Sequence, residues 1–364
     1  MYCDFYSIEN LSPMGDFLTA LHREIDLCAE FSGRGEFETV FFGGGTPSLL
    51  APLQLEKILS HLHDTFPITR DAEVTVETNP GTVTKEKLSA YRSLGVNRLS
   101  IGIQSFHEDE LKFLSRIHDS AQAKECVRLA REVGFENVSI DLIYGLPGQT
   151  RKRWEQNLRT ALHLNPQHIS AYGLIVEDGT PLARMVQARL VSPMPADDEA
   201  ELYECTMNFM EAHGFEHYEV SNYARSGFRS RHNYNYWRHG NYLGFGPSAH
   251  SFWSERGEKP RRWCNIANVS HYCRKLKMNE LPIVTEEELS CDQLLTERIF
   301  LGLRCDGVNL DRLRNDFGDD FRATHSMIID ALLAAQALTF DAQSLRLTSK
   351  GYLVCDEICA RLIA

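Results

Sequence analysis

The chain has 364 residues, of which 43% are hydrophobic and 24% charged, and its net charge is −12. This length and balance are typical of a globular chain with a large core and two domains. The acidic balance argues against general nucleic-acid binding, which needs a basic face, and neither a membrane span nor a signal peptide is predicted.

Five strand-and-helix units follow one another in the first half of the chain. The residues that end the strands, Gly43, Glu77, Gln104, Asp141 and Tyr172, are 34, 27, 37 and 31 residues apart, which is the size of a βα unit. Right-handed crossovers then give a parallel sheet or barrel, and too few repeats are visible for eight strands, so we expect an α/β fold with a partial, open barrel. The strands are predicted at 39–42, 73–77, 98–104, 138–143 and 168–174, with helices at 14–31, 52–66, 84–94, 121–133 and 153–164.

The first strand ends in three glycines, in the stretch Phe41-Phe42-Gly43-Gly44-Gly45-Thr46-Pro47-Ser48. Glycines remove every side chain, so the backbone can turn freely and a ligand can approach it closely. Bare backbone at the carboxyl end of a strand is where α/β proteins place ligands. A tight turn without a ligand is the alternative.

Polar residues end three further strands. Glu77, Gln104 and Asp141 should point to the same mouth of a barrel, and Arg116 lies in the region after one of these strands. Carboxylates there can accept hydrogen bonds from ribose hydroxyls, and a guanidinium can hold a carboxylate with two bonds. The alternative for Glu77 and Asp141 is a pair of rim residues in salt bridges.

The pattern changes after Tyr172. A long helix is predicted over 197–213 and an extended segment over 218–223, and a polar, aromatic region follows. From about residue 286 the chain reads as a separate helical unit with a short strand, which suggests a winged-helix-like module. We expect domains at 1–225, 226–285 and 286–364. The module's helices are predicted at 292–303, 310–317, 325–335 and 351–364, with a strand at 345–348.

The ten cysteines are scattered, and no CxxC pair occurs. Cys355 and Cys359 are four residues apart, which places them on one face of a helix. A chain of this size does not need a disulfide framework, so we expect reduced thiols and a cytoplasmic location.

Taken together, the order and spacing of six motifs resemble one known family. The chain is similar to radical S-adenosylmethionine proteins of the oxygen-independent coproporphyrinogen III oxidase-like group, and most similar to their heme chaperone branch. The resemblance covers essentially the whole length and implies a partial βα barrel with a carboxyl-terminal helical module. It rests on Tyr2-Cys3-Asp4-Phe5, Gly43-Gly44-Gly45-Thr46-Pro47-Ser48, Glu77-Thr78-Asn79-Pro80, Ser100-Ile101-Gly102-Ile103-Gln104-Ser105-Phe106, Asp141-Leu142-Ile143-Tyr144-Gly145-Leu146-Pro147-Gly148-Gln149-Thr150 and His232-Asn233-Tyr234-Asn235-Tyr236-Trp237.

The resemblance implies a [4Fe–4S] cluster. In this family three cysteines spaced CxxxCxxC after the first strand hold the cluster, and thiolates suit such iron. Cys3 matches the third cysteine, and the first two would precede Met1. The 364 residues as written are therefore expected not to hold the cluster, because of either a start placed too late or a truncated product.

The resemblance also implies contacts to S-adenosylmethionine. Gly44, Gly45 and Thr46 match the loop that meets the methionine moiety, and Tyr2 matches a residue beside the cluster that contacts the adenine. Further contacts match Glu77, Gln104, Arg116 and Asp141, together with Ile175, which matches an apolar adenine contact but which otherwise reads as plain core.

Two functional classes remain open. Members of the family that decarboxylate coproporphyrinogen III resemble one another in a fourth cysteine, two residues after the third, where this chain has Phe5. This favours a heme chaperone that passes heme to an acceptor protein over a radical decarboxylase. A scaffold that binds no cluster is a third alternative.

The segment that contains His232 supports the chaperone reading. An imidazole can be an axial heme ligand, and aromatic rings can flank a flat macrocycle. In the chaperone branch such a motif is linked with heme binding, so we expect His232 to contact heme, with His250 as the next candidate. The alternative is a surface histidine in a loop. The acceptor protein is unknown, and an oligomer is possible.

Overall fold

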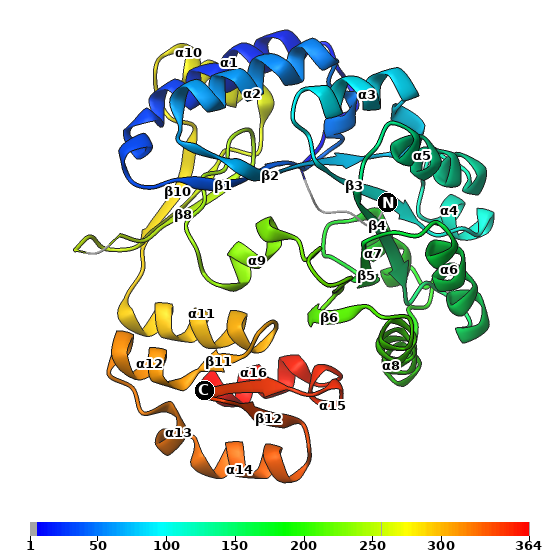
Figure 1. Ribbon diagram of the computed structural model, residues 1–364, viewed down its shortest axis with the longest axis vertical. Coiled ribbons are helices and arrows are strands. Elements are labelled where there is room, and N and C mark those ends of the chain that lie inside the picture. The colour runs from blue at the N-terminus through cyan, green and yellow to red at the C-terminus, as the bar shows by residue number, and fades with distance from the viewer. Residues whose placement is uncertain (1–5, 256, 364) are drawn as a thin grey trace. The chain divides into compact units, whose positions relative to one another are not determined.

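The computed structural model describes residues 6–255 and 257–363 (Figure 1). The chain forms two compact units, each built from several stretches. The larger unit contains the residues through Thr206, Gly244–His250 and Cys264–Thr285. The smaller unit contains Met207–Leu243, Ser251–Trp263 and the residues from Glu286 onward.

All five predicted strands are present in the larger unit, and their parallel pairing is confirmed. They follow an open arc, with helices on its outer side (Figure 1). In order, the parallel strands are β1 (Phe37–Phe42), β2 (Ile68–Thr78), β3 (Arg98–Gln104), β4 (Asn137–Tyr144) and β5 (His168–Gly173). Each of the five strands lies beside the next one along the chain, in the order β1-β2-β3-β4-β5.

Helices alternate with these strands, and several begin at a residue that caps them. Asp119 and Thr150 each accept a hydrogen bond from a backbone N–H of the first turn, which satisfies a donor that the helix leaves free. The first helix is shorter than predicted, because it gives way to a 3₁₀ turn over Ala29–Gly33. The helices are α1 (Met14–Leu27), α2 (Pro52–Thr65), α3 (Lys85–Ser93), α4 (Glu108–Phe113), α5 (Ser120–Glu132), α6 (Arg151–His163), α7 (Pro181–Gln187) and α8 (Ala196–Ala212).

The two faces of the parallel sheet differ in polarity. Successive side chains of a strand point to opposite faces. On β3, Leu99, Ile101 and Ile103 are fully buried, whereas the alternate positions include Arg98 and Ser100. The helices pack on the apolar face, and the opposite face carries the polar side chains.

Two late stretches of the chain complete the larger unit. Helix α10 (Val269–Lys277) packs on α1. The carboxylate of Glu24 on α1 is buried and accepts hydrogen bonds from the backbone N–H of Gly246 at 2.8 Å, Nδ2 of Asn265 at 2.5 Å and Oη of Tyr272 at 2.5 Å. Burial raises the pKa of Glu24 to about 7. The residues of β8 (His250–Trp253), β9 (Arg261–Asn265) and β10 (Ile283–Glu288) are divided between the two units.

The smaller unit contains helices and a small β-ribbon, as the winged-helix-like prediction requires. The extended segment expected over 218–223 is in fact a hairpin of β6 (Glu216–Glu219) and β7 (Asn222–Ala224), and the last predicted helix is two helices. Helix α9 (Arg231–Trp237) was not predicted. The remaining elements are α11 (Cys291–Leu303), β11 (Val308–Asn309), α12 (Leu310–Phe317), α13 (Phe321–Thr324), α14 (Ser326–Ala334), β12 (Leu338–Asp341), β13 (Ser344–Leu347), α15 (Ser349–Tyr352) and α16 (Cys355–Ile363). None of the helices in the described ranges combines the length and hydrophobicity that a bilayer crossing requires.

Candidate functional site

The glycine loop follows β1 and touches the end of β2. The backbone N–H of Gly44 donates a hydrogen bond to Oε2 of Glu77 at 3.1 Å. Gly44 has a φ of +103°, which L residues with a side chain rarely adopt. A Cβ on Gly43 would lie 2.5 Å from the Phe41 ring and 3.4 Å from Cδ of Glu77. The loop therefore needs glycine at position 44 for its turn and at position 43 because a Cβ would collide with the Phe41 ring.

Ser48, at the end of the same loop, ties it to the loop after β2. Its side chain is fully buried, and Oγ accepts a hydrogen bond from the backbone N–H of Asn79 at 3.1 Å. Oγ also lies 2.6 Å from the hydroxyl of Thr82. Sequence reasoning included Ser48 in the motif but assigned it no role, and the structure gives it a positioning one.

The Glu77 carboxyl is partly buried at the mouth of the curled sheet. Burial and the negative charge of Asp141 raise the pKa of Glu77 to about 7. The Gly44 N–H and the Arg98 charge act in the opposite direction. A group poised near neutrality changes its charge readily when a cationic or hydrogen-bonding ligand arrives.

Asp141 lies on the inner face of β4 and is surrounded by hydroxyl groups. Burial raises its pKa, while hydrogen bonds and the charge of Arg98 lower it. Oγ of Ser100 lies 3.1 Å from each of its carboxylate oxygens, and Oγ of Ser139 donates at 3.3 Å. A third serine, Ser170 on β5, also bonds this carboxylate. The serines hold the acid in one orientation without neutralising it.

Gln104 and Arg116 lie together above Gly102 near the end of β3. A Cβ on Gly102 would be 3.1 Å from Nε2 of Gln104 and 3.4 Å from Nη2 of Arg116. Gln104 has a φ of +72°, and the pairing register with β4 shifts there. Such backbone strain gathers at functional sites. Nη2 of Arg116 donates to the Gly102 carbonyl at 2.9 Å, and its buried Nε has no hydrogen-bond partner among the described residues.

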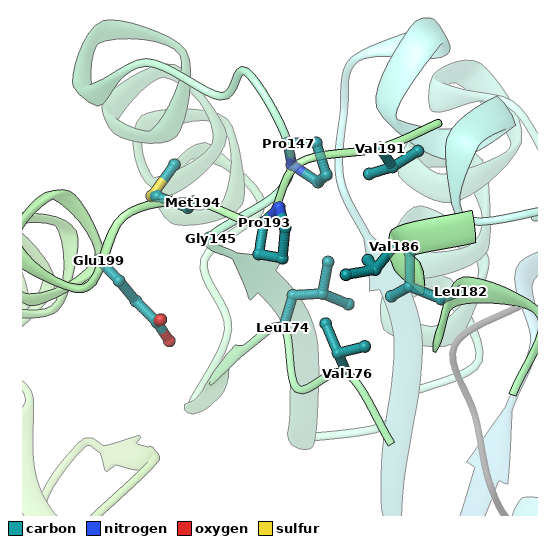
Figure 2. A pocket seen from close by; sticks show the side chains of 10 residues that line it. All are labelled: Gly145, Pro147, Leu174, Val176, Leu182, Val186, Val191, Pro193, Met194 and Glu199. Carbon is teal, nitrogen blue, oxygen red and sulfur yellow. The ribbon is translucent and has the colours of Figure 1, made fainter. Parts of the chain in front are cut away.

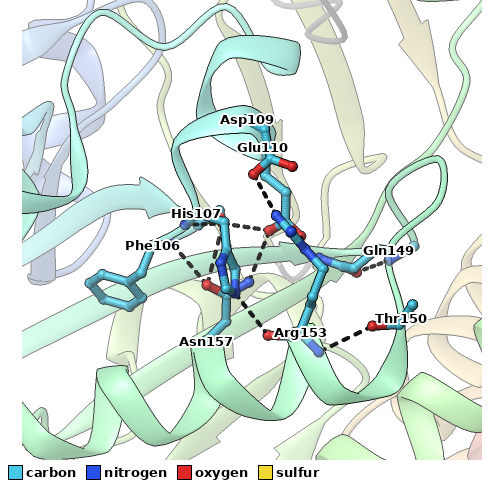
Figure 3. Close-up of polar contacts among 10 residues, drawn as sticks. Phe106, His107, Asp109, Glu110, Gln149, Thr150, Arg153 and Asn157 are labelled. Carbon is cyan, nitrogen blue, oxygen red and sulfur yellow. Dashed lines mark hydrogen bonds and ion pairs between the residues drawn. The ribbon is translucent and has the colours of Figure 1, made fainter.

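A buried polar network anchors the loop that follows Gln104 (Figure 3). Asn157 on α6 accepts a hydrogen bond from the backbone N–H of Phe106 at 2.8 Å and donates to Glu110 at 3.1 Å. Glu110 also accepts from Ser105 at 2.5 Å and from Nε of Arg153 at 3.0 Å. The network links α4 to α6 and holds the loop after β3 in place.

Ile175 follows β5 and is 66% exposed. Its neighbours Leu174 and Val176 line a small pocket of about 30 Å³, whose wall also contains Glu199 (Figure 2). That volume holds one or two water molecules and no cofactor. The exposed Ile175 side chain is therefore held on an anchored segment, where an apolar ligand face could cover it.

The larger unit brings most of the predicted contacts to the carboxyl ends of its parallel strands. Tyr2 and Cys3 lie outside the described residues. Within the part of the chain that the structure describes, no group of three or more His, Cys, Asp or Glu residues is placed to hold a metal ion. The residues predicted to contact S-adenosylmethionine that lie at these strand ends are Gly44, Gly45, Thr46, Glu77, Gln104, Asp141 and Ile175, and Arg116 follows α4.

His232 belongs to the smaller unit, on α9. Nε2 of His232 lies 2.9 Å from the hydroxyl of Tyr236, one helical turn later. The Tyr236 ring is in turn edge-on to Tyr242, with ring centroids 4.6 Å apart. No residue of α9 is fully buried. The motif therefore presents an imidazole and aromatic rings at partly open positions.

His250 lies in the larger unit, at the start of β8, and is exposed. Nε2 of His250 is 3.5 Å from the sulfur of Cys264 on β9. A histidine and a cysteine side by side could bind a metal centre, but two donors alone are a weak site.

Sequence reasoning missed the polar groups that line the inner face of the sheet. The signal was available, because Arg98 and Ser100 alternate with apolar residues along β3. Without the strand register, however, nothing in the sequence aligns them with groups on neighbouring strands. The missed residues are Arg98, Ser100, Ser139, His168 and Ser170.

Comparisons with known proteins agree with this architecture. Residues 1–161 match the Radical SAM superfamily, and residues 289–354 match the HemN C-terminal domain. The heme chaperone HemW of Bacillus subtilis is 36% identical over 361 residues, which cover 98% of this chain and 94% of that protein. The heme chaperone HemW of Mycobacterium tuberculosis is 35% identical, over 100% of this chain and 91% of that protein.

The solved structure of coproporphyrinogen III oxidase (HemN) from Escherichia coli, described as a radical SAM enzyme, has a similar fold. The TM-score is 0.83 at 22% identity, and the match covers 100% of this chain and 86% of that one. At this identity the similarity concerns the fold alone. It confirms the predicted partial barrel followed by a smaller helical domain.

Proposed function

This chain belongs to the HemW family of radical SAM proteins, and from that premise we propose that it is a heme chaperone, which binds heme and passes it to an acceptor protein. The observation that carries the proposal is the arrangement on α9. His232 and Tyr236 stand one turn apart on a helix without a fully buried residue, beside the ring of Tyr242. Such a site supplies an axial ligand and flanking rings for a flat macrocycle.

We further propose that the strand ends of the larger unit bind S-adenosylmethionine. The bare backbone of Gly44 and Gly45 would meet its methionine moiety, and Arg116 would pair with its carboxylate. Glu77 and Asp141 would accept hydrogen bonds from its cationic or hydroxyl groups. Gln104 and Ile175 would complete the contacts. Because no group of three or more His, Cys, Asp or Glu residues in the described ranges could hold a metal ion, we assign no step to an iron–sulfur cluster.

The alternative is oxidative decarboxylation of coproporphyrinogen III. The similar fold of the oxidase does not favour it, because 22% identity supports the fold alone. The relatives from Bacillus subtilis and Mycobacterium tuberculosis, which align over nearly the whole chain, carry the chaperone name. Turnover of coproporphyrinogen III by this chain would overturn the chaperone proposal.

The chaperone proposal is tested by titrating the full chain with ferric heme and recording the absorbance of the complex. Truncating His232→Ala should weaken heme binding at least about tenfold, the loss of one good ligand contact. His213→Ala is the matched control, because His213 also contacts an aromatic ring one turn away, that of Phe209, and should leave affinity unchanged. Equal affinities of the His232→Ala variant and the wild type would remove His232 from the site, and a wild type that binds no heme would remove the function.

A further inference from the structure

A buried cation lies on the same face of the sheet as the two acids of the proposed S-adenosylmethionine site. Arg98 opens β3 and is 2% exposed. It pairs in register with Thr75, and two residues later Ser100 pairs with Glu77. Because residues two apart on a strand share a face and paired residues of neighbouring strands do too, Arg98 and Glu77 face the same interior.

Neighbouring strands add other charged or titratable groups to this interior. Glu73 and Glu77 share the face on β2, Asp141 lies on β4, and His168 opens β5. The charge of Arg98 lowers the pKa of Glu77 and of Asp141. Burial, and secondarily Arg98, lower the pKa of His168 well below its usual value, so this imidazole is neutral. Arg98 is thus the group that supplies positive charge to both acids.

Hydrogen bonds connect the same groups. Oγ of Ser139 lies 2.8 Å from Nδ1 of His168 and donates to Asp141 at 3.3 Å. Nε of Arg98 is buried without a hydrogen-bond partner among the described residues. Two carboxyl groups close together in a partly buried site would keep at least one proton if no cation were near. A protonated carboxyl group accepts hydrogen bonds poorly and cannot pair with a cation.

We propose that Arg98 is a positioning residue, whose charge offsets part of the proton affinity that burial gives Glu77 and Asp141, so that near neutral pH these acids can ionise and accept hydrogen bonds from S-adenosylmethionine. The inference rests on the proposed function for the ligand. The charge state of the acids can nevertheless be measured without it.

The test is a pH titration of the full chain with ¹³C-labelled Glu and Asp carboxyl groups, followed by NMR. Glu77→Gln and Asp141→Asn assign the two resonances. In Arg98→Met, which keeps the length of the side chain without its charge, the titration midpoint of Glu77 should rise by at least about one pH unit, a tenfold gain in proton affinity. Arg98→Lys, which keeps the charge, should restore most of the shift.

Arg131→Met is the matched control. Arg131 is another partly buried arginine of the larger unit, but its guanidinium donates to the carbonyls of Phe135, Glu136 and Asn165. Its loss should leave the Glu77 midpoint unchanged. A Glu77 midpoint in folded Arg98→Met equal to that of the wild type would overturn the proposal.

A measurement on the wild type covers the case in which the variants do not fold. The side-chain ¹⁵N resonances of Arg98 should titrate with the same midpoint as the Glu77 carboxyl carbon, and independent midpoints would overturn the proposal. In parallel, S-adenosylmethionine affinity should fall at least tenfold at pH 7 in Arg98→Met and recover at higher pH. A wild type that binds no S-adenosylmethionine would contradict the proposed function, while the carboxyl titration would still decide the role of Arg98.

Discussion

At the scale of single residues, several acidic side chains are buried, and their surroundings differ. Glu77 and Glu219 on β6 each accept a backbone N–H, but Glu77 also lies near the positive charge of Arg98. Glu219 is 1% exposed, and its Oε1 has no hydrogen-bond partner among the described residues. Burial raises the pKa of Glu219 to about 8. An acid of this kind holds its proton in the folded state and loses it on unfolding.

This difference predicts a pH-dependent stability. Glu219 has an ordinary pKa of 4.5 and a folded pKa of about 8, so the folded state binds the extra proton between these values. Its stabilising contribution is complete below pH 4.5 and is lost as the pH rises through 8. The urea midpoint of the wild type should fall between pH 5.5 and 8.5, and in Glu219→Gln it should fall less.

The control for Glu219 is Glu216→Gln, on the same strand but exposed. This variant should follow the wild type at both pH values. If Glu219→Gln and Glu216→Gln have the same pH dependence, burial of Glu219 does not govern stability in this range.

At the scale of elements, the support of the site comes from packing between helices. The network of Glu110 and Asn157 joins α4 to α6 beneath the loop after β3 (Figure 3). Glu110 is 6% exposed and accepts from three side chains. The removal of a buried acceptor leaves its donors unsatisfied, which costs more than an exposed ion pair contributes.

Glu110→Ala should therefore lower the free energy of unfolding by roughly 3 kcal/mol. Arg151→Ala, which removes exposed ion pairs to Glu155 and Glu201 on α6 and α8, should cost less than about 1 kcal/mol. Urea denaturation followed by circular dichroism measures both. Equal losses in the two variants would contradict the idea that the network supports the fold.

At the scale of the whole molecule, the larger unit is assembled from stretches far apart in the sequence. Glu24 on α1 bonds Gly246, Asn265 and Tyr272, which follow more than 200 residues later. Figure 1 shows helix α10, which contains Tyr272, beside α1. These contacts join the start of the chain to 264–285. A contact between residues so far apart in the sequence closes a long loop, and its stabilising free energy has to offset the chain entropy lost on closure.

Loss of the Glu24 contacts should loosen that junction. Glu24→Ala leaves three donors without their acceptor and should cost roughly 3 kcal/mol or more, with faster amide hydrogen exchange over 264–285. Asp26→Ala on the same helix removes only exposed pairs with Arg23 and His61 and should cost less than about 1 kcal/mol. Unchanged exchange in Glu24→Ala would show that other packing holds the junction.

Patterns of neighbouring residues predicted much of the fold. The five parallel strands and most of their helices follow from apolar periodicity and from turn residues, because these signals are local. Helix α9 was missed because its residues are mainly polar and aromatic and leave no apolar stripe. The hairpin of β6 and β7 was read as one segment because the turn at Val220 and Ser221 carries no glycine or proline.

The sequence by itself determined where the five parallel strands lie along the chain, the glycine loop and the residues that end each strand, since each depends on a short stretch of chain. Only the tertiary structure decided that Arg98, Glu77 and Asp141 share one interior, and that Glu24 meets segments from the far half of the chain. The physical reason is register. A shift of one residue between two strands turns every side chain to the opposite face, and no local pattern specifies which residue of one strand lies beside which residue of the next.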